Sequence, residues 1–272
     1  MALQFDPLPQ GFGAEVTGLD PAHVASQDEI ATLQAAFAEH HLLVIRDCGR
    51  LSHIRQNEIT GWFGKCEEVG DEPMTMDNAM DRGRAVLPFH CDITYFPYPF
   101  EGISLHTLEL PRVPTTTLFV SNAVAWDTLP EALRQDLSGC KARHFYEDDG
   151  KMQTPVTVFE YWHPVRLPHY RSGRPLLFVT EHHVEEIQGY SREESAALLG
   201  RLFAHLYAPE RCYEHVWREG DLLVWDNYAI QHARPHEAHP DDGRRLLQRC
   251  SFGEHGFADQ LDDLCRAAGV AA

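Results

Sequence analysis

Two histidines and a carboxylate are spaced in this chain like ligands of a metal ion. His90 and Asp92 flank Cys91 in the strand-like run 87–95, and side chains at i and i+2 of a strand point to the same side. A distant His232 follows another apolar run. Two histidines and one carboxylate on one face of a metal leave three positions open, which suits Fe(II) enzymes that bind a chelating cosubstrate and dioxygen.

The His-x-Asp pattern alone is a weak signal, because a second copy occurs at His239-Pro240-Asp241. The proline and the following acidic and glycine residues favour a surface turn there, whereas aromatic and β-branched residues surround His90. We therefore expect His90, and not His239, to bind the metal. On the pattern alone, the alternative is a buried His90 that is hydrogen-bonded to a neighbour.

An arginine-rich strand is predicted at residues 244–249. On a strand, Arg245 and Arg249 share a face, so we expect both to point inward while Arg244 and Gln248 point out. A guanidinium presents paired donors to a carboxylate, and an inward Arg245 would orient a dicarboxylate whose other end chelates the metal. These arginines form a local positive site in a chain of net charge −18.

Length and composition predict one domain over residues 1–272. The content of 43% hydrophobic and 24% charged residues is ordinary for a soluble globular protein. The acidic balance argues against nucleic acid as a partner, and no membrane-length apolar run or signal peptide is visible. Seven cysteines without a Cys-x-x-Cys pair fit reduced thiols. We expect a cytoplasmic homo-oligomer that acts on a small molecule.

Capping boxes and apolar spacing predict helices that cover a core. The boxes are Ser26 with Glu29, Thr128 with Glu131, and Ser191 with Glu194. A further helix is expected at about 258–267, with Leu261 and Leu264 inward. Strands are expected at 41–46, 103–110, 117–121, 176–180, 222–225 and 246–251. Short strands without regular βα alternation predict a mainly β fold with flanking helices, a double-stranded β-helix of the jelly-roll or cupin-like type.

The segment just ahead of the first two candidate ligands shows little periodicity. It contains Asp71-Glu72-Pro73 and Asp81-Arg82-Gly83-Arg84. We expect a mobile lid loop near 66–88, where it could close over the metal. The alternative is a surface loop without a role in the reaction.

Several motifs in the same order resemble the taurine dioxygenase (TauD/TfdA) family of Fe(II)- and 2-oxoglutarate-dependent dioxygenases. They are His90-x-Asp92, Trp225-Asp226-Asn227 followed by Gln231-His232, and the Arg245 and Arg249 pair. The resemblance extends to 42–47, His163-Pro164-Val165, 173–179 and the Ser191 helix. It implies that His90, Asp92 and His232 bind Fe(II), and that Thr117 and Arg245 bind the distal carboxylate of 2-oxoglutarate. It places Arg249 near the metal-bound carboxylate or an anionic substrate group.

The implied activity uses dioxygen to hydroxylate an unactivated C–H bond of a small organic substrate, with succinate and CO2 as coproducts. Desaturation by the same oxidised iron is an alternative within this chemistry. A zinc-dependent hydrolase with the same three ligands is a second alternative, although it would not need the inward arginines. A non-oxidative, metal-dependent ligand-binding jelly roll is a third.

Two departures from taurine dioxygenase bear on the substrate. The gap from His232 to the arginines is slightly longer, which leaves Arg244 as a fallback for Arg245. Residues 85–88 are apolar where taurine dioxygenase carries polar groups that receive the substrate amine, and an apolar wall does not favour an ammonium group. We expect a larger, partly apolar substrate. The residues expected around it are Leu87, Phe89, Ile93, Tyr95 and Arg249.

Overall fold

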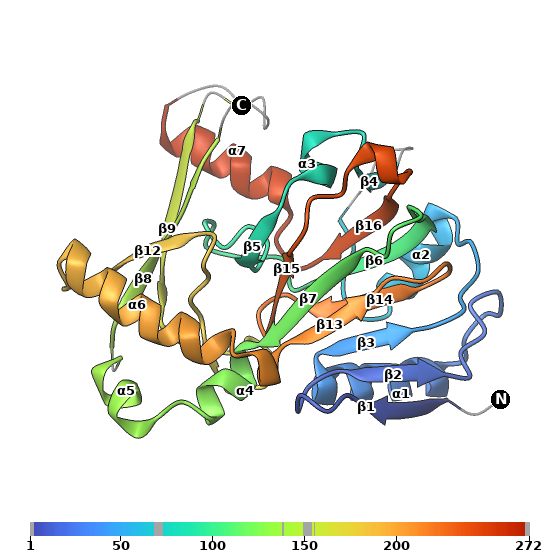
Figure 1. Ribbon diagram of the computed structural model, residues 1–272, viewed down its shortest axis with the longest axis horizontal. Helices are drawn as coiled ribbons and strands as arrows, with labels where there is room; N and C mark the ends of the chain where they lie inside the picture. Colours follow the sequence, from blue (N-terminus) through green and yellow to red (C-terminus); the bar gives the residue numbers. More distant parts are fainter. Residues whose placement is uncertain (1–2, 68–72, 138, 149–153, 155, 270–272) are drawn as a thin grey trace.

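The computed structural model describes residues 3–67, 73–137, 139–148, 154 and 156–269. Its largest sheet has seven strands, which Figure 1 shows beside the N-terminal helix. In spatial order they are β1 (Gln4–Pro7), β2 (Ala14–Thr17), β3 (Leu42–Ile45), β14 (Leu222–Asp226), β6 (Gly102–Glu109), β16 (Leu246–Phe252) and β4 (Met74–Asp77). Neighbours pair antiparallel except β2 and β3, which are parallel.

One face of this sheet is covered by α1 (Gln27–His40) and α2 (His53–Thr60). Leu33 and Phe37 of α1 and Ile59 of α2 pack in one cluster with buried residues of β3 and β14. Successive side chains of a strand point to opposite faces of the sheet, so the other buried side chains of β3 and β14 lie on the face away from the helices. That face packs against a second sheet.

The second sheet has four antiparallel strands: β13 (Tyr213–Val216), β7 (Thr116–Ser121), β15 (Ile230–Arg234) and β5 (Leu87–His90). Phe119 and Ile230 from this sheet share a buried cluster with Leu105 and Trp225 from the larger one. The mixed, β-rich architecture with flanking helices predicted from the sequence is confirmed. The candidate metal ligands and the predicted inward arginines come from strands and turns on both sides of this core.

A third sheet and helix α6 (Arg192–Leu206) form a flanking part, at the left of Figure 1. Its three-stranded sheet has the order β12 (Val184–Ile187), β8 (Lys141–Glu147), β9 (Val158–Pro164), and β10 (Arg166–Pro168) pairs with β11 (Pro175–Leu177). The other elements are α3 (Asp81–Arg84), α4 (Asn122–Asp127), α5 (Glu131–Asp136), η1 (Pro209–Arg211), η2 (Pro240–Asp242) and α7 (Phe257–Ala267). Helix α6 packs on β12. None of the helices in the described ranges is both long and apolar enough to span a bilayer.

Two of the three predicted capping boxes are present. The boxes of Ser26 and Ser191 begin α1 and α6, each with its reciprocal glutamate bond. The box at Thr128 is wrong, because Thr128 ends α4 and its hydroxyl donates to the Val124 carbonyl at 2.7 Å. Helix α5 begins after Pro130 instead. The predicted C-terminal helix is α7.

The predicted strands coincide with β3, β6, β7, β11, β14 and β16 within a few residues. The run 87–95 departs from prediction, because β5 ends at His90 and turns follow it, with Ile93 at a φ of 53°. The segment 66–88 contains β4 and α3, while the part of the predicted lid at 68–72 lies outside the described residues.

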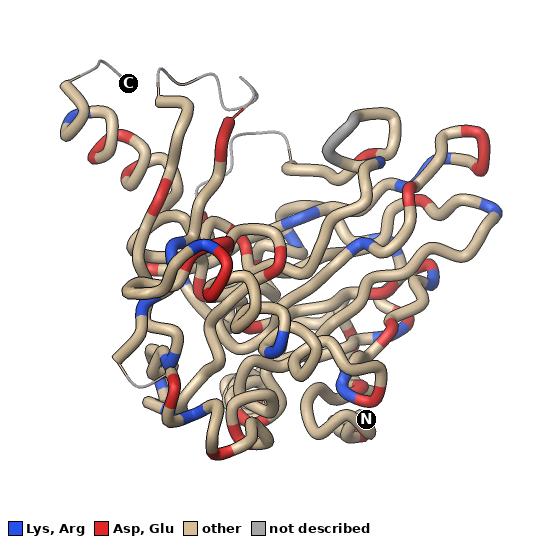
Figure 2. Tube along the Cα trace, turned by 60° about the vertical axis from the view of Figure 1, so that its left-hand side comes forward, with Lys and Arg blue, Asp and Glu red and all other residues tan. Residues whose placement is uncertain are grey.

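Acidic and basic residues are interspersed along the chain in Figure 2. Several arginines are held by acidic partners, as Arg46 is by Asp221 at 2.7 Å and Arg143 by Glu160 at 3.1 Å. Such pairing is expected in a chain with net charge −18. A buried arginine without a carboxylate partner is therefore unusual here and indicates a place where an anionic ligand could bind.

Candidate metal centre and cosubstrate pocket

The two candidate histidine ligands lie opposite each other on neighbouring strands. His232 of β15 pairs in register with His90 of β5, and their ring centroids are 4.2 Å apart. Cross-strand partners on one face bring their side chains together. The register of the four-stranded sheet therefore positions both imidazoles, although the two histidines are 142 residues apart in the sequence.

The candidate carboxylate ligand is positioned by a buried asparagine and not by the strand. The backbone N–H of Asp92 donates to Asn227 Oδ1 at 2.8 Å, and Asn227 Nδ2 donates to the Asp92 carbonyl at 3.1 Å. The prediction that His90 and Asp92 share one strand face is wrong, because the strand ends between them. The Asn227 side chain instead clamps the backbone of the turn, which gives this residue of the Trp-Asp-Asn motif a physical role.

The three side chains form a compact donor set. His90 Nε2 lies 3.3 Å and His232 Nε2 lies 3.5 Å from Asp92 Oδ1. Ligand atoms of all three lie within 4.8 Å of one another. His90 Nδ1 is 2.8 Å from the Pro88 carbonyl, which favours a proton on Nδ1 and leaves Nε2 as a lone-pair donor. Two imidazoles and a carboxylate at this separation fit a divalent transition metal.

The charge states of the set also suit a metal ligand. Burial, with His90 nearby, lowers the pKa of His232 to about 3, so its imidazole is neutral at pH 7. Burial alone would raise the pKa of Asp92, but Arg249 and the two histidines hold it well below its usual range. Arg249 Nη2 donates to Asp92 Oδ2 at 2.6 Å. One carboxylate oxygen is thus held by Arg249, and the other faces the histidines.

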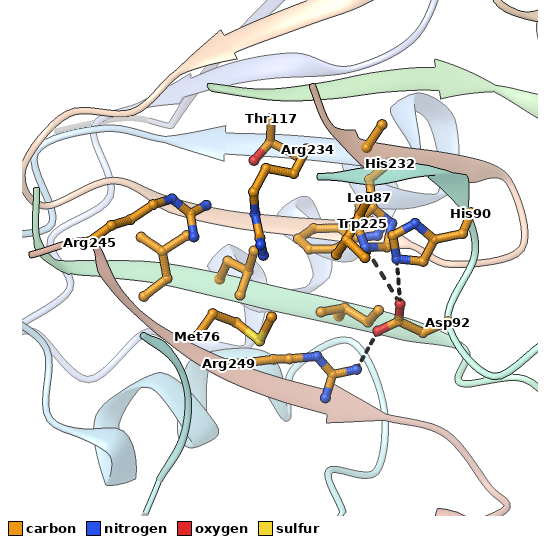
Figure 3. Close-up of a pocket in the computed structure, with 14 residues that line it drawn as sticks. Met76, Leu87, His90, Asp92, Thr117, Trp225, His232, Arg234, Arg245 and Arg249 are labelled. Atoms are coloured by element: carbon orange, nitrogen blue, oxygen red, sulfur yellow. Dashed lines mark hydrogen bonds and ion pairs between the residues drawn. The ribbon is translucent and has the colours of Figure 1, made fainter. Parts of the chain in front are cut away.

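A pocket extends from these ligands between the two sheets, and Figure 3 shows its side chains. Its wall combines apolar residues with three arginines. The lining residues are Met76, Leu87, His90, Asp92, Ile103, Leu105, Thr117, Trp225, His232, Ala233, Arg234, Arg245, Leu247 and Arg249. Arg245, Leu247 and Arg249 share the pocket face, as the predicted strand register requires.

Arg245 is a buried cation that the described protein residues do not fully satisfy. Its Nε donates to Thr115 Oγ1 at 3.0 Å, but its buried Nη1 has no hydrogen-bond partner among the described residues. No acidic side chain in the described ranges forms an ion pair with it. Burial, with a smaller contribution from Arg234, lowers the pKa of Arg245 to about 9. A carboxylate ligand would relieve this cost.

Thr117 presents a hydroxyl with a fixed orientation. Trp217 Nε1 donates to Thr117 Oγ1 at 2.9 Å, and an indole N–H can only donate. Thr117 therefore accepts this bond and keeps its own proton for another acceptor. Since Thr117 lines the pocket, that acceptor can be a ligand oxygen.

The structure brings several other predicted residues to different places. Arg244 is exposed as predicted and pairs with Asp77 at 2.7 Å, so it is no substitute for Arg245. Gln248 points away from the pocket, as predicted, but it is buried beneath α2. There its Nε2 donates to Gln56 Oε1 at 2.7 Å. The exposed His239 pairs with Asp241 at 3.3 Å and is not part of the donor set.

Only two of the five predicted substrate residues line this pocket. They are Leu87 and Arg249. Phe89 instead stacks on Tyr207 in the core at a centroid distance of 4.4 Å, and Ile93 and Tyr95 pack in a separate aromatic cluster. The apolar residues at 85–88 were the reason for expecting them there, but Phe89 lies on the strand face opposite His90, and the turn after His90 carries Ile93 and Tyr95 away from the pocket.

Sequence reasoning missed two groups near the metal ligands. Arg234 follows His232 by two residues on β15, a spacing that would have placed it on the pocket side. His182 and His183 are the other group, because both rings lie near that of His90, at centroid distances of 5.6 and 6.0 Å. They lie in a turn before β12, where strand alternation does not apply.

Comparison with known proteins places the chain among oxygenases. The family described as "Taurine catabolism dioxygenase TauD, TfdA family" matches residues 4–251. An alkylsulfatase of Acinetobacter baylyi is 26% identical, over 94% of this chain and 88% of its own. An (S)-phenoxypropionate/alpha-ketoglutarate-dioxygenase of Delftia acidovorans is 28% identical over 85% and 88%. The crystal structure of a taurine dioxygenase from Burkholderia xenovorans superimposes with a TM-score of 0.79, at 27% identity, covering 92% of this chain and 90% of its own.

Proposed function

Because the chain belongs to the TauD/TfdA family of Fe(II)/2-oxoglutarate-dependent dioxygenases, we propose that His90, Asp92 and His232 hold its iron. The observation that carries this assignment is the compact donor set, with all three ligand atoms within 4.8 Å. We further propose that the seven- and four-stranded sheets are the two layers of a double-stranded β-helix. The cytoplasmic location and the homo-oligomer expected from the sequence stay predictions.

For the cosubstrate, we propose that Arg245 and Thr117 bind the distal carboxylate of 2-oxoglutarate. Arg245 has an unsatisfied buried donor, and Thr117 has a hydroxyl proton to donate. Both line the pocket that leads to the metal ligands. A dicarboxylate held there would direct its keto acid end toward the iron.

In the reaction, bound Fe(II) and 2-oxoglutarate supply the oxidation of a substrate C–H bond by dioxygen, with release of succinate and CO2. The protein residues bind and orient the reactants. Arg249 keeps Asp92 ionised and oriented, and the apolar wall of Leu87, Leu105 and Trp225 limits water near the reacting atoms. We propose hydroxylation as the outcome; desaturation by the same three-ligand iron is the alternative.

We propose that the substrate is an organic anion with an apolar body. Apolar side chains line the pocket beside three arginines, and the relatives include an alkylsulfatase and a phenoxypropionate dioxygenase. Arg249 Nη2 is held by Asp92, whereas its Nη1 makes, among the described residues, only a 3.4 Å bond to Ser251 Oγ and a contact with Met74. That nitrogen is placed to meet an anionic group of the substrate or the cosubstrate.

We propose that the segment 73–88 covers this pocket. The Ala238 N–H donates to the Arg84 carbonyl at 3.0 Å, and Arg84 pairs with Glu237 at 3.4 Å. These contacts join the segment to the chain that follows β15. Met76 and Leu87 from the same segment line the pocket.

A substrate screen tests this assignment. With Fe(II), 2-oxoglutarate and dioxygen, we expect aryloxyalkanoates or alkyl sulfates to stimulate succinate formation more than taurine does. The reason is that apolar surface contributes about 25 cal/mol per Å² on burial, whereas the wall has no polar group for an ammonium. If taurine is the best substrate by kcat/KM, the proposed pocket chemistry is wrong, although the oxygenase assignment stands.

The Trp217 bond to Thr117 gives a second prediction. Trp217→Phe should raise the KM for 2-oxoglutarate about fivefold with little change in kcat, because a net hydrogen bond contributes about 1 kcal/mol. Steady-state kinetics with varied 2-oxoglutarate would measure this. In a Thr117→Val background the same substitution should add almost nothing, and a full additional effect there would show that Trp217 does not act through Thr117.

A further inference from the structure

The cosubstrate pocket contains a second buried guanidinium. Arg234 is only 6% exposed and lines the pocket together with Arg245. In Figure 3 its side chain lies between that of Arg245 and the candidate metal ligands. Its Nη1 donates to the Ala85 carbonyl at 2.8 Å, which fixes the guanidinium in this position.

The charges of the pocket favour a dianion at this place. Asp92 is the one acidic residue among the described residues that line the pocket, and it is engaged by Arg249 at 2.6 Å. Arg234 and Arg245 interact unfavourably, since the charge of Arg234 contributes to the lowered pKa of Arg245. A carboxylate between two guanidiniums would replace this repulsion by two charge-assisted hydrogen bonds.

Building on the proposed function, we propose that Arg234 is a second contact for the distal carboxylate of 2-oxoglutarate and selects dicarboxylates over 2-oxo monoacids. A carboxylate has about four acceptor positions, so it can accept from Arg234, Arg245 and Thr117 together. Because the Ala85 carbonyl already orders the Arg234 side chain, binding costs little further side-chain entropy. The residue is thus a specificity-determining group of the cosubstrate site.

The same hydrogen bond connects the cosubstrate to the segment in front of β5. Ala85 precedes Leu87, which lines the pocket, and the neighbouring Arg84 contacts the chain after β15. A distal carboxylate that holds Arg234 would therefore also steady this segment over the bound cosubstrate.

A binding experiment without turnover tests this role. Isothermal titration of Mn(II)-loaded protein, without oxygen, would compare 2-oxoglutarate with 2-oxopentanoate, which has a methyl group in place of the distal carboxylate. The ratio of the two Kd values measures recognition of that carboxylate. The variants are Arg234→Met, Arg234→Lys and Arg245→Met. The control is Arg143→Met, which removes a surface arginine that pairs with Glu160 and Glu186.

We expect Arg234→Met to lower the preference for 2-oxoglutarate by at least about tenfold, as expected for loss of a desolvated charge contact. Arg234→Lys, which keeps the charge, should retain part of the preference, and Arg143→Met should retain all of it. An equal loss of affinity for both ligands in Arg234→Met would mean a structural role and would overturn the inference.

Two further outcomes separate this inference from the proposed function. An unchanged preference in Arg234→Met with a lowered one in Arg245→Met would reject the role of Arg234 and leave the proposed cosubstrate site intact. An unchanged preference in both variants would reject the placement of the distal carboxylate itself. If Arg234→Met does not fold, a wild-type preference in Arg234→Lys combined with unchanged affinity for both ligands would count against a direct guanidinium contact.

Discussion

Replacing any one of His90, Asp92 and His232 by alanine is expected to abolish iron-dependent turnover while the protein still folds. Each substitution removes one of three ligands, so both the affinity for the metal and its geometry are lost. The three side chains line the pocket, and only the His232 ring also contacts the described apolar core, at a centroid distance of 4.9 Å from Trp225, so their truncation removes few core contacts. Succinate formation, bound iron and thermal unfolding of each variant measure the three expectations.

The second His-x-Asp motif provides the matched control. His239 is exposed and interacts with its own neighbour Asp241, so His239→Ala should be nearly silent in all three measurements. If any ligand variant keeps more than a few per cent of the activity, that residue does not belong to the site. A loss of bound iron in His239→Ala would mean that the wrong motif was chosen.

Arg245→Ala is expected to raise the KM for 2-oxoglutarate by at least about thirtyfold. Truncating one partner of a buried charge pair costs about 2–5 kcal/mol, and each 1.4 kcal/mol is about a factor of ten. The KM for the primary substrate should change much less, because Arg245 lies at the end of the pocket away from the metal ligands in Figure 3. Kinetics with each reactant varied in turn would separate the two effects.

Arg244→Ala is the control for this prediction. Its guanidinium is half-exposed and pairs with Asp77 and Glu109 outside the pocket, so its loss should leave the 2-oxoglutarate requirement close to wild type. Large and equal effects from Arg244 and Arg245 would contradict the strand register that places only Arg245 in the pocket.

The sequence predicted the parts of the site that depend on regular strands. Leu247 and Arg249 point into the pocket from one face of β16, as the strand period of two predicts, and Arg245, which immediately precedes the strand, lines the same pocket. The cross-strand pairing of His90 with His232 could not be derived from periodicity, because it depends on the register between distant strands. The family resemblance supplied that link.

The errors arise where the chain leaves regular structure. Asp92 reaches the candidate metal site through a turn that Asn227, 135 residues away in the sequence, holds by two hydrogen bonds, and no local pattern signals such a contact. The same turn moves Ile93 and Tyr95 into an aromatic cluster. Arg234 was within reach of sequence reasoning, because it follows His232 at strand spacing.

A crystal structure of the protein with Mn(II) and 2-oxoglutarate, determined without oxygen, tests the central assignment most directly. The metal, located by its anomalous scattering, should be bound by Nε2 of His90, Nε2 of His232 and Oδ1 of Asp92. The distal carboxylate should lie within hydrogen-bond distance of Arg245 and Thr117. A metal bound by other residues, or a 2-oxoglutarate whose distal carboxylate points away from Arg245, would contradict the site described for this enzyme.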